Sequence, residues 1–194
     1  MLNRLVLSGA ALFAATMPAF AHLDPAAHGS FMAGFSHPLF GLDHIMAMAA
    51  VGLWAAMLGG RALVLVPAAF VGTMLLGFAA ALFGLPLPFV EPVILASVVF
   101  IGLMVALALP LPASAVAGLV AFFAFFHGHA HGGELGAAGA AQFAIGFALA
   151  TALLHTAGIA AGLAFARRQG GSGTLARLAG AATAAAGLWL AVAG

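Results

Sequence analysis

The chain after residue 30 consists of long apolar runs separated by short stretches rich in glycine, proline and arginine. A helix of about 20 apolar residues crosses the hydrocarbon core of a membrane. The runs are continuous and do not alternate with polar positions, which disfavours the strands of a membrane β-barrel. The pattern therefore predicts an all-α, polytopic membrane bundle of six helices, at 36–58, 62–83, 91–109, 112–127, 139–165 and 174–193.

The start of the chain has the pattern of a secretory signal peptide. Arg4 precedes a short apolar stretch that ends in an A-x-A cleavage site at residues 19–21. We expect cleavage after Ala21, which leaves one six-helix domain over residues 22–194. The new N-terminus, His22, then faces the periplasm of a bacterium. The alternative is an uncleaved first transmembrane helix.

The composition also indicates a membrane protein. Hydrophobic residues make up 65% of the 194 residues and charged residues 5%, with a mean hydropathy of +1.24. Soluble domains contain roughly 25% charged residues. We therefore expect a multi-pass protein of the bacterial inner membrane. The net charge of +1 provides no basic surface for nucleic acid, and the lack of cysteine excludes thiolate metal sites and disulfides.

The charged residues predict one orientation. If His22 faces the periplasm, alternation of the six spans places every arginine of the mature chain on the cytoplasmic side, as the positive-inside rule requires. These arginines are Arg61, Arg167, Arg168 and Arg177. The same alternation places three of the four acids on the outer side, namely Asp24, Glu91 and Glu134. The number of spans and the orientation therefore support each other.

The first candidate site is HPLFGLDH, residues 37–44, at the outer start of the first span. On a continuous helix, His37 and His44 lie two turns apart on one face, with Asp43 beside that face. Ionisable groups inside a bilayer cost at least ~2.5–3.5 kcal/mol each and need partners. Two imidazoles and a carboxylate suit a divalent first-row metal ion. The alternative is an Asp–His pair that only joins two helices.

The second candidate site is FFAFFHGHAHGGEL, residues 122–135. If the fourth helix continues outward, His127, His131 and Glu134 share one face and His129 points elsewhere. The glycines of this stretch instead allow an unwound backbone whose carbonyls join a metal site. A solvated histidine loop is the third interpretation. Because phenylalanines directly precede His127, we expect this histidine to enter the membrane and the stretch to capture metal.

Two further histidines complete the candidate metal residues. His155 lies near the middle of the fifth span, where it either belongs to an ion pathway or bonds a carbonyl of a neighbouring helix. The mature N-terminus at His22 combines an imidazole with a free amine, which together can chelate metal if cleavage occurs. The predicted depths suggest an inward order, with His131 and Glu134 at the outer mouth, then His44, then His155.

These residues resemble the HupE/UreJ family of bacterial nickel and cobalt permeases. The likeness rests on His-x5-Asp-His at 37–44 and on Phe-His-Gly-x-Ala-His-Gly-x-Glu at 126–134, together with the signal peptide and the six spans. It covers nearly the whole chain. The resemblance implies that His155 matches a polar position of the family's fifth span. It also implies a set of transport residues: His37, Asp43, His44, His127, His131 and Glu134.

The resemblance implies a secondary transporter and not an enzyme, with Ni²⁺ or Co²⁺ as cargo and no tightly bound cofactor. The sequence contains no G-x-x-x-x-G-K-[ST] phosphate loop, and neither H-E-x-x-H nor G-x-S-x-G occurs. The alternative is a membrane b-type cytochrome in which His44, His127 and His155 supply axial haem ligands. Assembly into a homo-oligomer is left open.

Overall fold

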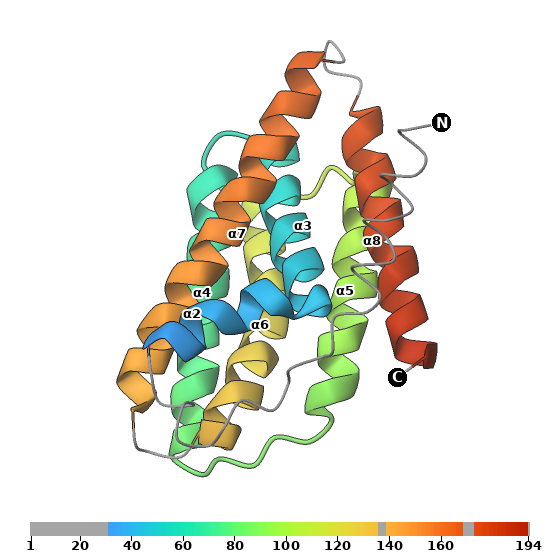
Figure 1. Cartoon of the computed structure of the whole chain (residues 1–194). Helices are drawn as coiled ribbons and strands as arrows, with labels where there is room; N and C mark the ends of the chain where they lie inside the picture. The colour runs from blue at the N-terminus through green and yellow to red at the C-terminus, as the bar shows by residue number, and fades with distance from the viewer. Residues whose placement is uncertain (1–30, 136–138, 169–172, 194) are drawn as a thin grey trace, which may run out of the picture.

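The computed structural model describes residues 31–135, 139–168 and 173–193 (Figure 1). The secondary structure of this part of the chain is entirely helical, which confirms the all-α prediction. The helices are α2 (Phe31–Phe40), α3 (Leu42–Leu58), α4 (Ala62–Leu82), α5 (Val90–Leu107), α6 (Ala113–Leu135), α7 (Ala140–Arg168) and α8 (Thr174–Ala193). The predicted signal peptide and His22 lie outside the described residues.

Five of these helices, α4 to α8, are long and apolar enough to cross a membrane. They begin and end close to the predicted spans, because each is one uninterrupted apolar run. The largest difference is in α6, which ends at Leu135 and not near residue 127. A sixth crossing is formed by α2 and α3 if this bent pair is counted as one span.

The first predicted span, 36–58, was wrong as a continuous helix. Helices α2 and α3 meet at an angle of 82°, with Gly41 between them. Two residues explain the break: Pro38 lies inside α2, and Gly41 is extended, with φ −82° and ψ 116°. The Gly41 carbonyl still accepts the first hydrogen bond of α3, from the Ile45 amide at 2.9 Å. The chain therefore runs across α7 as α2 and then turns into the bundle as α3 (Figure 1).

Glycines let the helix backbones approach closely, as is common in membrane bundles. A Cβ atom added at Gly128 would overlap the main chain of Met74, and one at Gly132 would overlap the carbonyl of Phe78, so α6 packs tightly along α4. Helix α6 stays regular through this stretch, which contradicts the interpretation in which its glycines unwind the backbone. These glycines of the second motif therefore serve packing.

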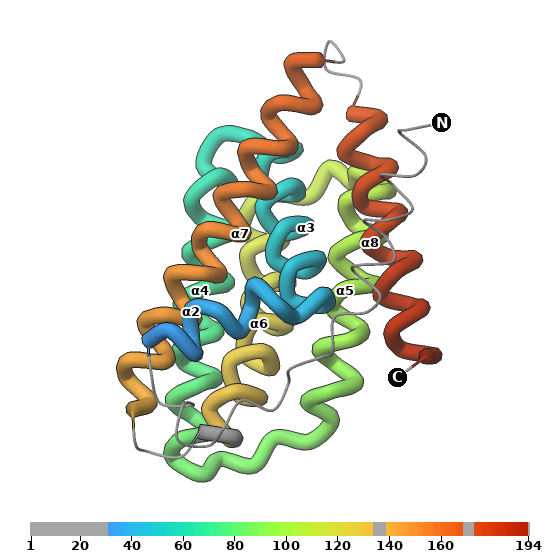
Figure 2. Tube along the Cα trace, in the orientation of Figure 1, coloured from blue at the N-terminus to red at the C-terminus, as the bar shows by residue number. Residues whose placement is uncertain are grey.

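The C-terminal ends of α3 and α7 and the start of α8 lie at the same end of the bundle (Figure 2), and the arginines of the described residues are found there. Arg61 follows α3, Arg167 and Arg168 end α7, and Arg177 lies in the first turn of α8. Arg177 Nε donates a hydrogen bond to the Ala106 carbonyl near the end of α5, at 2.8 Å. This placement agrees with the grouping that the positive-inside rule predicts.

Candidate metal site

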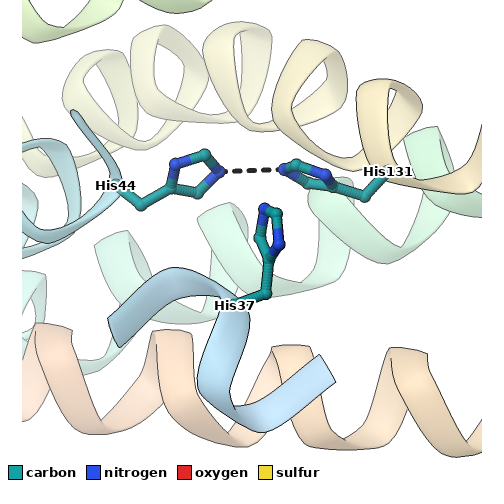
Figure 3. Close-up of side chains that lie close together, drawn as sticks. All are labelled: His37, His44 and His131. Carbon is teal, nitrogen blue, oxygen red and sulfur yellow. Dashed lines mark hydrogen bonds between the residues drawn. The ribbon is translucent and has the colours of Figure 1, made fainter. Parts of the chain in front are cut away.

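Three histidines from three helices converge at the bend between α2 and α3 (Figure 3). They are His37 of α2, His44 of α3 and His131 of α6, and we call them the three-histidine cluster. One ring nitrogen from each lies within 4.8 Å of the other two. His44 and His131 are buried, whereas His37 is partly exposed. The bend, which the sequence did not predict, brings His37 onto the other two.

The spacing within the cluster suits a shared metal ion. The Nε2 atoms of His44 and His131 are 2.9 Å apart. A first-row metal ion bonds imidazole nitrogen at about 2.1 Å, so two ligands at right angles lie about 3.0 Å apart. The ring of His37 completes the group, with centroid distances of 4.2 Å to His131 and 5.3 Å to His44. The three side chains could therefore bind one ion with little movement.

Asp43 orients the central histidine. Its Oδ2 atom lies 3.0 Å from Nδ1 of His44, an ion-pair contact that holds the carboxylate against the imidazole. Nε2 of His44 faces the cluster and shares one hydrogen with Nε2 of His131, a hydrogen that a metal ion would replace. Gly41 leaves room for this pair, because a Cβ atom there would lie 3.0 Å from both Asp43 Oδ1 and His44 Nδ1.

The helix ends around the bend add to the electrostatics of the site. His37 lies in the last turn of α2, where the carbonyl end of a helix favours positive charge. Asp43 lies in the first turn of α3, where the amide end favours negative charge. The carboxylate offsets the positive end of α3, so a cation can lie beside the bend without facing an uncompensated helix N-terminus.

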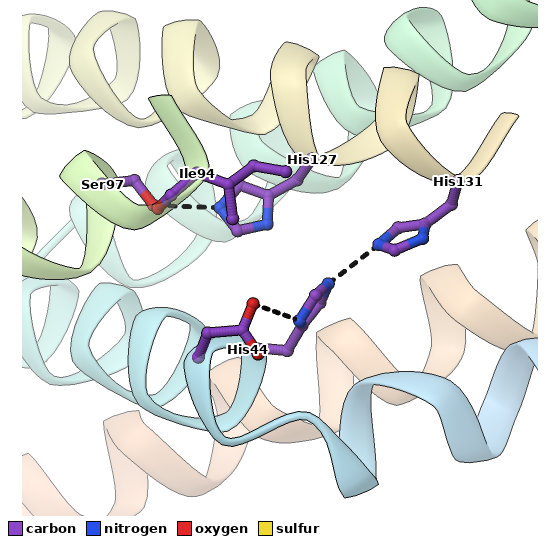
Figure 4. Close-up of polar contacts among 6 residues, drawn as sticks. His44, Ile94, Ser97, His127 and His131 are labelled. Carbon is purple, nitrogen blue, oxygen red and sulfur yellow. Dashed lines mark hydrogen bonds and ion pairs between the residues drawn. The ribbon is translucent and has the colours of Figure 1, made fainter. Parts of the chain in front are cut away.

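His127 lies one turn before His131 on α6 and contacts a residue that the sequence analysis missed (Figure 4). Its ring is fully buried, with its centroid 5.4 Å from that of His44. Its Nε2 atom lies 3.0 Å from the hydroxyl oxygen of Ser97 on α5. The sequence could have indicated Ser97, because a single hydroxyl in an apolar span needs a hydrogen-bond partner.

Two buried phenylalanines surround these histidines and were also missed. The ring of Phe147 on α7 lies 5.0 to 6.3 Å from the rings of all three cluster histidines. The ring of Phe70 on α4 contacts both His127, at 5.8 Å, and His155, at 5.0 Å. Nothing in the sequence distinguishes these two residues from the 15 other phenylalanines of the chain, which number 17 in all.

His155 is buried in α7, away from the three-histidine cluster. It follows Phe147 by two turns, or about 12 Å along the helix. Neither ring nitrogen has a hydrogen-bond partner within the part of the chain that the structure describes. The expected alternative, a bond to the carbonyl of a neighbouring helix, is therefore not what this part of the structure shows.

Comparison with known proteins identifies the family. A family model described as HupE / UreJ protein matches residues 10–190. The chain belongs to the HupE/UreJ family. A relative named Protein HupE, from Rhizobium leguminosarum bv. viciae, is 43% identical over 114 residues, which are 57% of this chain and 60% of the relative. The chain thus matches less than two thirds of that relative's length, and no solved structure matches it.

The residues that the HupE/UreJ motifs indicate fall into separate groups in the structure. His37, His44 and His131 come together, with Asp43 against His44. His131 and His44, which were predicted at successive depths, are in direct contact, and their order along a path stays a prediction. His129 is outside the group, since its Nε2 lies 2.7 Å from the Leu85 carbonyl.

Glu134 lies within α6, because this helix continues to Leu135. This agrees with the interpretation in which the fourth helix extends past His127 and includes the whole motif. The side chain of Glu134 lies outside what the structure describes, as does the whole of His22. Their roles as metal ligands stay predictions.

Proposed function

We propose that this chain is a secondary permease that moves divalent nickel, or cobalt, from the periplasm to the cytoplasm across the bacterial inner membrane. The observation that carries the proposal is the three-histidine cluster, which is set among apolar helices. Buried imidazoles whose nitrogens converge need a proton or a metal ion between them, because an unpaired buried polar group is unfavourable.

The ligand types favour nickel or cobalt as cargo. Imidazole and carboxylate groups suit divalent nickel, cobalt and zinc, whereas Cu(I) prefers thiolates and thioethers. The chain contains no cysteine, and Asp43 brings a carboxylate to the cluster. The separation of 2.9 Å between the Nε2 atoms of His44 and His131 is compatible with neighbouring ligands at right angles, an arrangement open to both nickel and cobalt.

The break at Gly41 supports transport in place of permanent storage of the ion. Transporter binding sites commonly form at interrupted helices, whose ends supply partial charges to the ion. In this chain the interruption between α2 and α3 lies beside the cluster, and His37 and Asp43 come from opposite sides of it. A hinge at this point would let α2 move relative to α3 and alter the distance between His37 and His44.

The histidines define a route through the bundle. An ion enters past the partly exposed His37, with Glu134 and the mature His22 as capture residues at the entrance. It is held by the three-histidine cluster and reaches His127 next, since this ring adjoins His44. Phe70 contacts both His127 and His155, so its ring must shift for the ion to continue towards the arginine-bearing end.

The membrane potential suffices as a driving force. A divalent ion that enters an inside-negative cell gains about 4.6 kcal/mol per 100 mV, twice the value for a single charge. The chain has no phosphate-binding loop for ATP. Binding must therefore be weak enough for release on the inner side, as in any conduction pathway.

A haem-binding function is not favoured by the distances. An iron ion between two axial imidazoles separates their nitrogens by about 4 Å, and the porphyrin needs an open slot around it. The candidate haem ligands His44 and His127 instead have their ring centroids only 5.4 Å apart. The fully buried ring of His127 also packs against Phe70 and Ser97, so the space beside it is filled.

Uptake of ⁶³Ni²⁺ and ⁵⁷Co²⁺ into proteoliposomes, with and without an imposed potential, tests the proposal. We expect uptake that increases with an inside-negative potential. Asp43→Ala should abolish it while membrane insertion stays intact, because His44 loses the group that orients its ring. Normal uptake by this variant would contradict the proposed pathway, and uptake of neither ion by the native protein would contradict the function.

A further inference from the structure

The contacts of Ser97 determine where the proton of His127 is. The Ser97 hydroxyl donates its only hydrogen to the Ile94 carbonyl, at 2.6 Å, one turn earlier on α5. Its oxygen can then only accept from His127 Nε2, which lies 3.0 Å away. A neutral His127 therefore carries its hydrogen on Nε2, and its lone pair is on Nδ1.

The Nδ1 atom of His127 is positioned as a ligand. It lies on the side of the ring that faces away from Ser97 and towards His44 (Figure 4). It is buried and has no hydrogen-bond partner among the described residues. An acceptor that is buried without a donor is unfavourable unless a cation or a water molecule reaches it.

We propose that Ser97 is a positioning residue which fixes the tautomer and the ring orientation of His127, so that Nδ1 becomes the next ligand inward of the three-histidine cluster. The inference rests on the proposed function. His44 contacts both groups, because its ring lies 5.1 Å from that of His131 and 5.4 Å from that of His127. An ion can thus pass from His131 to His127 while His44 stays bound to it.

The same contacts explain why the hydroxyl has to be donated to the main chain. If the Ser97 hydrogen pointed to His127 instead, Nε2 would hold the lone pair and Nδ1 would carry a hydrogen towards His44. A hydrogen in that direction would repel a cation. The Ile94 carbonyl oxygen lies 2.6 Å from the Ser97 oxygen, and two oxygens this close need the serine hydrogen between them, which disfavours this arrangement. Hydrogen-bond partners that orient a metal ligand in this way typically contribute 10–100-fold to metal affinity.

Nitrogen NMR of the histidine rings in the detergent-solubilised full chain tests the tautomer directly, without any metal. We expect the native protein to show His127 with its hydrogen on Nε2, a signal assigned by its loss in His127→Gln. Ser97→Ala should lose this preference, and Ser97→Thr should restore it because threonine keeps the hydroxyl. A native His127 with its hydrogen on Nδ1 would overturn the inference.

Binding of ⁶³Ni²⁺ by equilibrium dialysis tests the ligand role in the same samples. Ser97→Ala should weaken binding roughly 10–100-fold, and Ser97→Thr should recover it. The matched control is Ser36→Ala, because Ser36 makes the same kind of bond to the carbonyl three residues earlier, that of Ala33 at 3.2 Å. We expect this control to bind like the native protein.

Two outcomes separate the inference from the proposed function. Unchanged nickel affinity in Ser97→Ala, with native binding intact, would overturn the inference alone. A native protein that shows the expected tautomer but binds neither nickel nor cobalt would contradict the proposed function, and with it the ligand role of His127.

Discussion

The three-histidine cluster and His155 are two buried histidine environments that differ in what surrounds their nitrogens. In the cluster, His44 contacts a carboxylate on one side and His131 on the other. Around His155, the neighbouring ring is that of Phe70, and both imidazole nitrogens lack a partner among the described residues. A charged group and converging ring nitrogens suit a place where a cation is held. A single neutral imidazole suits a place that the cation only passes.

This difference has an energetic reason. A divalent ion in a low-dielectric interior must recover a large part of its hydration energy from its ligands. The cluster provides several nitrogens and the Asp43 charge, whereas His155 provides one side chain. An unpaired buried polar group costs about 1–3 kcal/mol of stability. We therefore expect His155 to have a role in moving the ion that offsets this cost.

The largest effect should come from removing the centre of the cluster. His44 contacts His37, His131, His127 and Asp43, so His44→Ala removes a ligand and isolates the carboxylate. We expect ⁶³Ni²⁺ binding and uptake to be abolished, a larger loss than the roughly 10–100-fold expected for Ser97→Ala. His129→Ala is the matched control, because His129 is on the same helix as His131 but bonds the Leu85 carbonyl. Retained binding in His44→Ala would show that the cluster is not the holding site.

A smaller and different effect is expected at His155. His155→Ala leaves the cluster intact, so equilibrium binding of ⁶³Ni²⁺ should stay at the native level. The uptake rate should fall by about tenfold or more, because the ion loses the ligand that lowers its barrier beyond Phe70. The two measurements are made on the same preparation, by dialysis and in proteoliposomes. Weakened binding with unchanged uptake would reverse the roles assigned to the two environments.

The smallest effect is expected at the bend. In Gly41→Ala the new Cβ atom lies 3.0 Å from both Asp43 Oδ1 and His44 Nδ1, so the pair must shift by a few tenths of an ångström. We expect nickel affinity to fall by about tenfold at most, since the partner is displaced and not removed. Gly72→Ala is the control, because Gly72 is on α4 and a Cβ atom there meets nothing within 4 Å. That variant should bind nickel normally and be more stable by roughly 0.5–1 kcal/mol. Equal binding by both variants would show that the spacing at Gly41 is unimportant.

The sequence alone determined the membrane bundle and its elements. Five spans were predicted nearly to the residue at most ends, because the length of an apolar run and the glycine, proline or arginine that ends it are local properties. The candidate ligands were also visible locally, since ionisable side chains are rare in apolar segments. The two motifs therefore identified His37, Asp43, His44 and His131 before their positions were known.

Only the tertiary structure decided how these residues meet. Pro38 and Gly41 permit the bend of 82°, but where α2 then lies, packed against α7, is a tertiary feature. Without the bend His37 would lie two turns away from His44 along one helix. Contacts between distant segments made the cluster a single site and not a succession of stations. They also gave Ser97, Phe70 and Phe147 their places beside the histidines. Membrane insertion depends on the composition of each segment. Ligand geometry depends instead on which faces of the helices are in contact. Close packing of backbones at glycines in several helices determines these contacts.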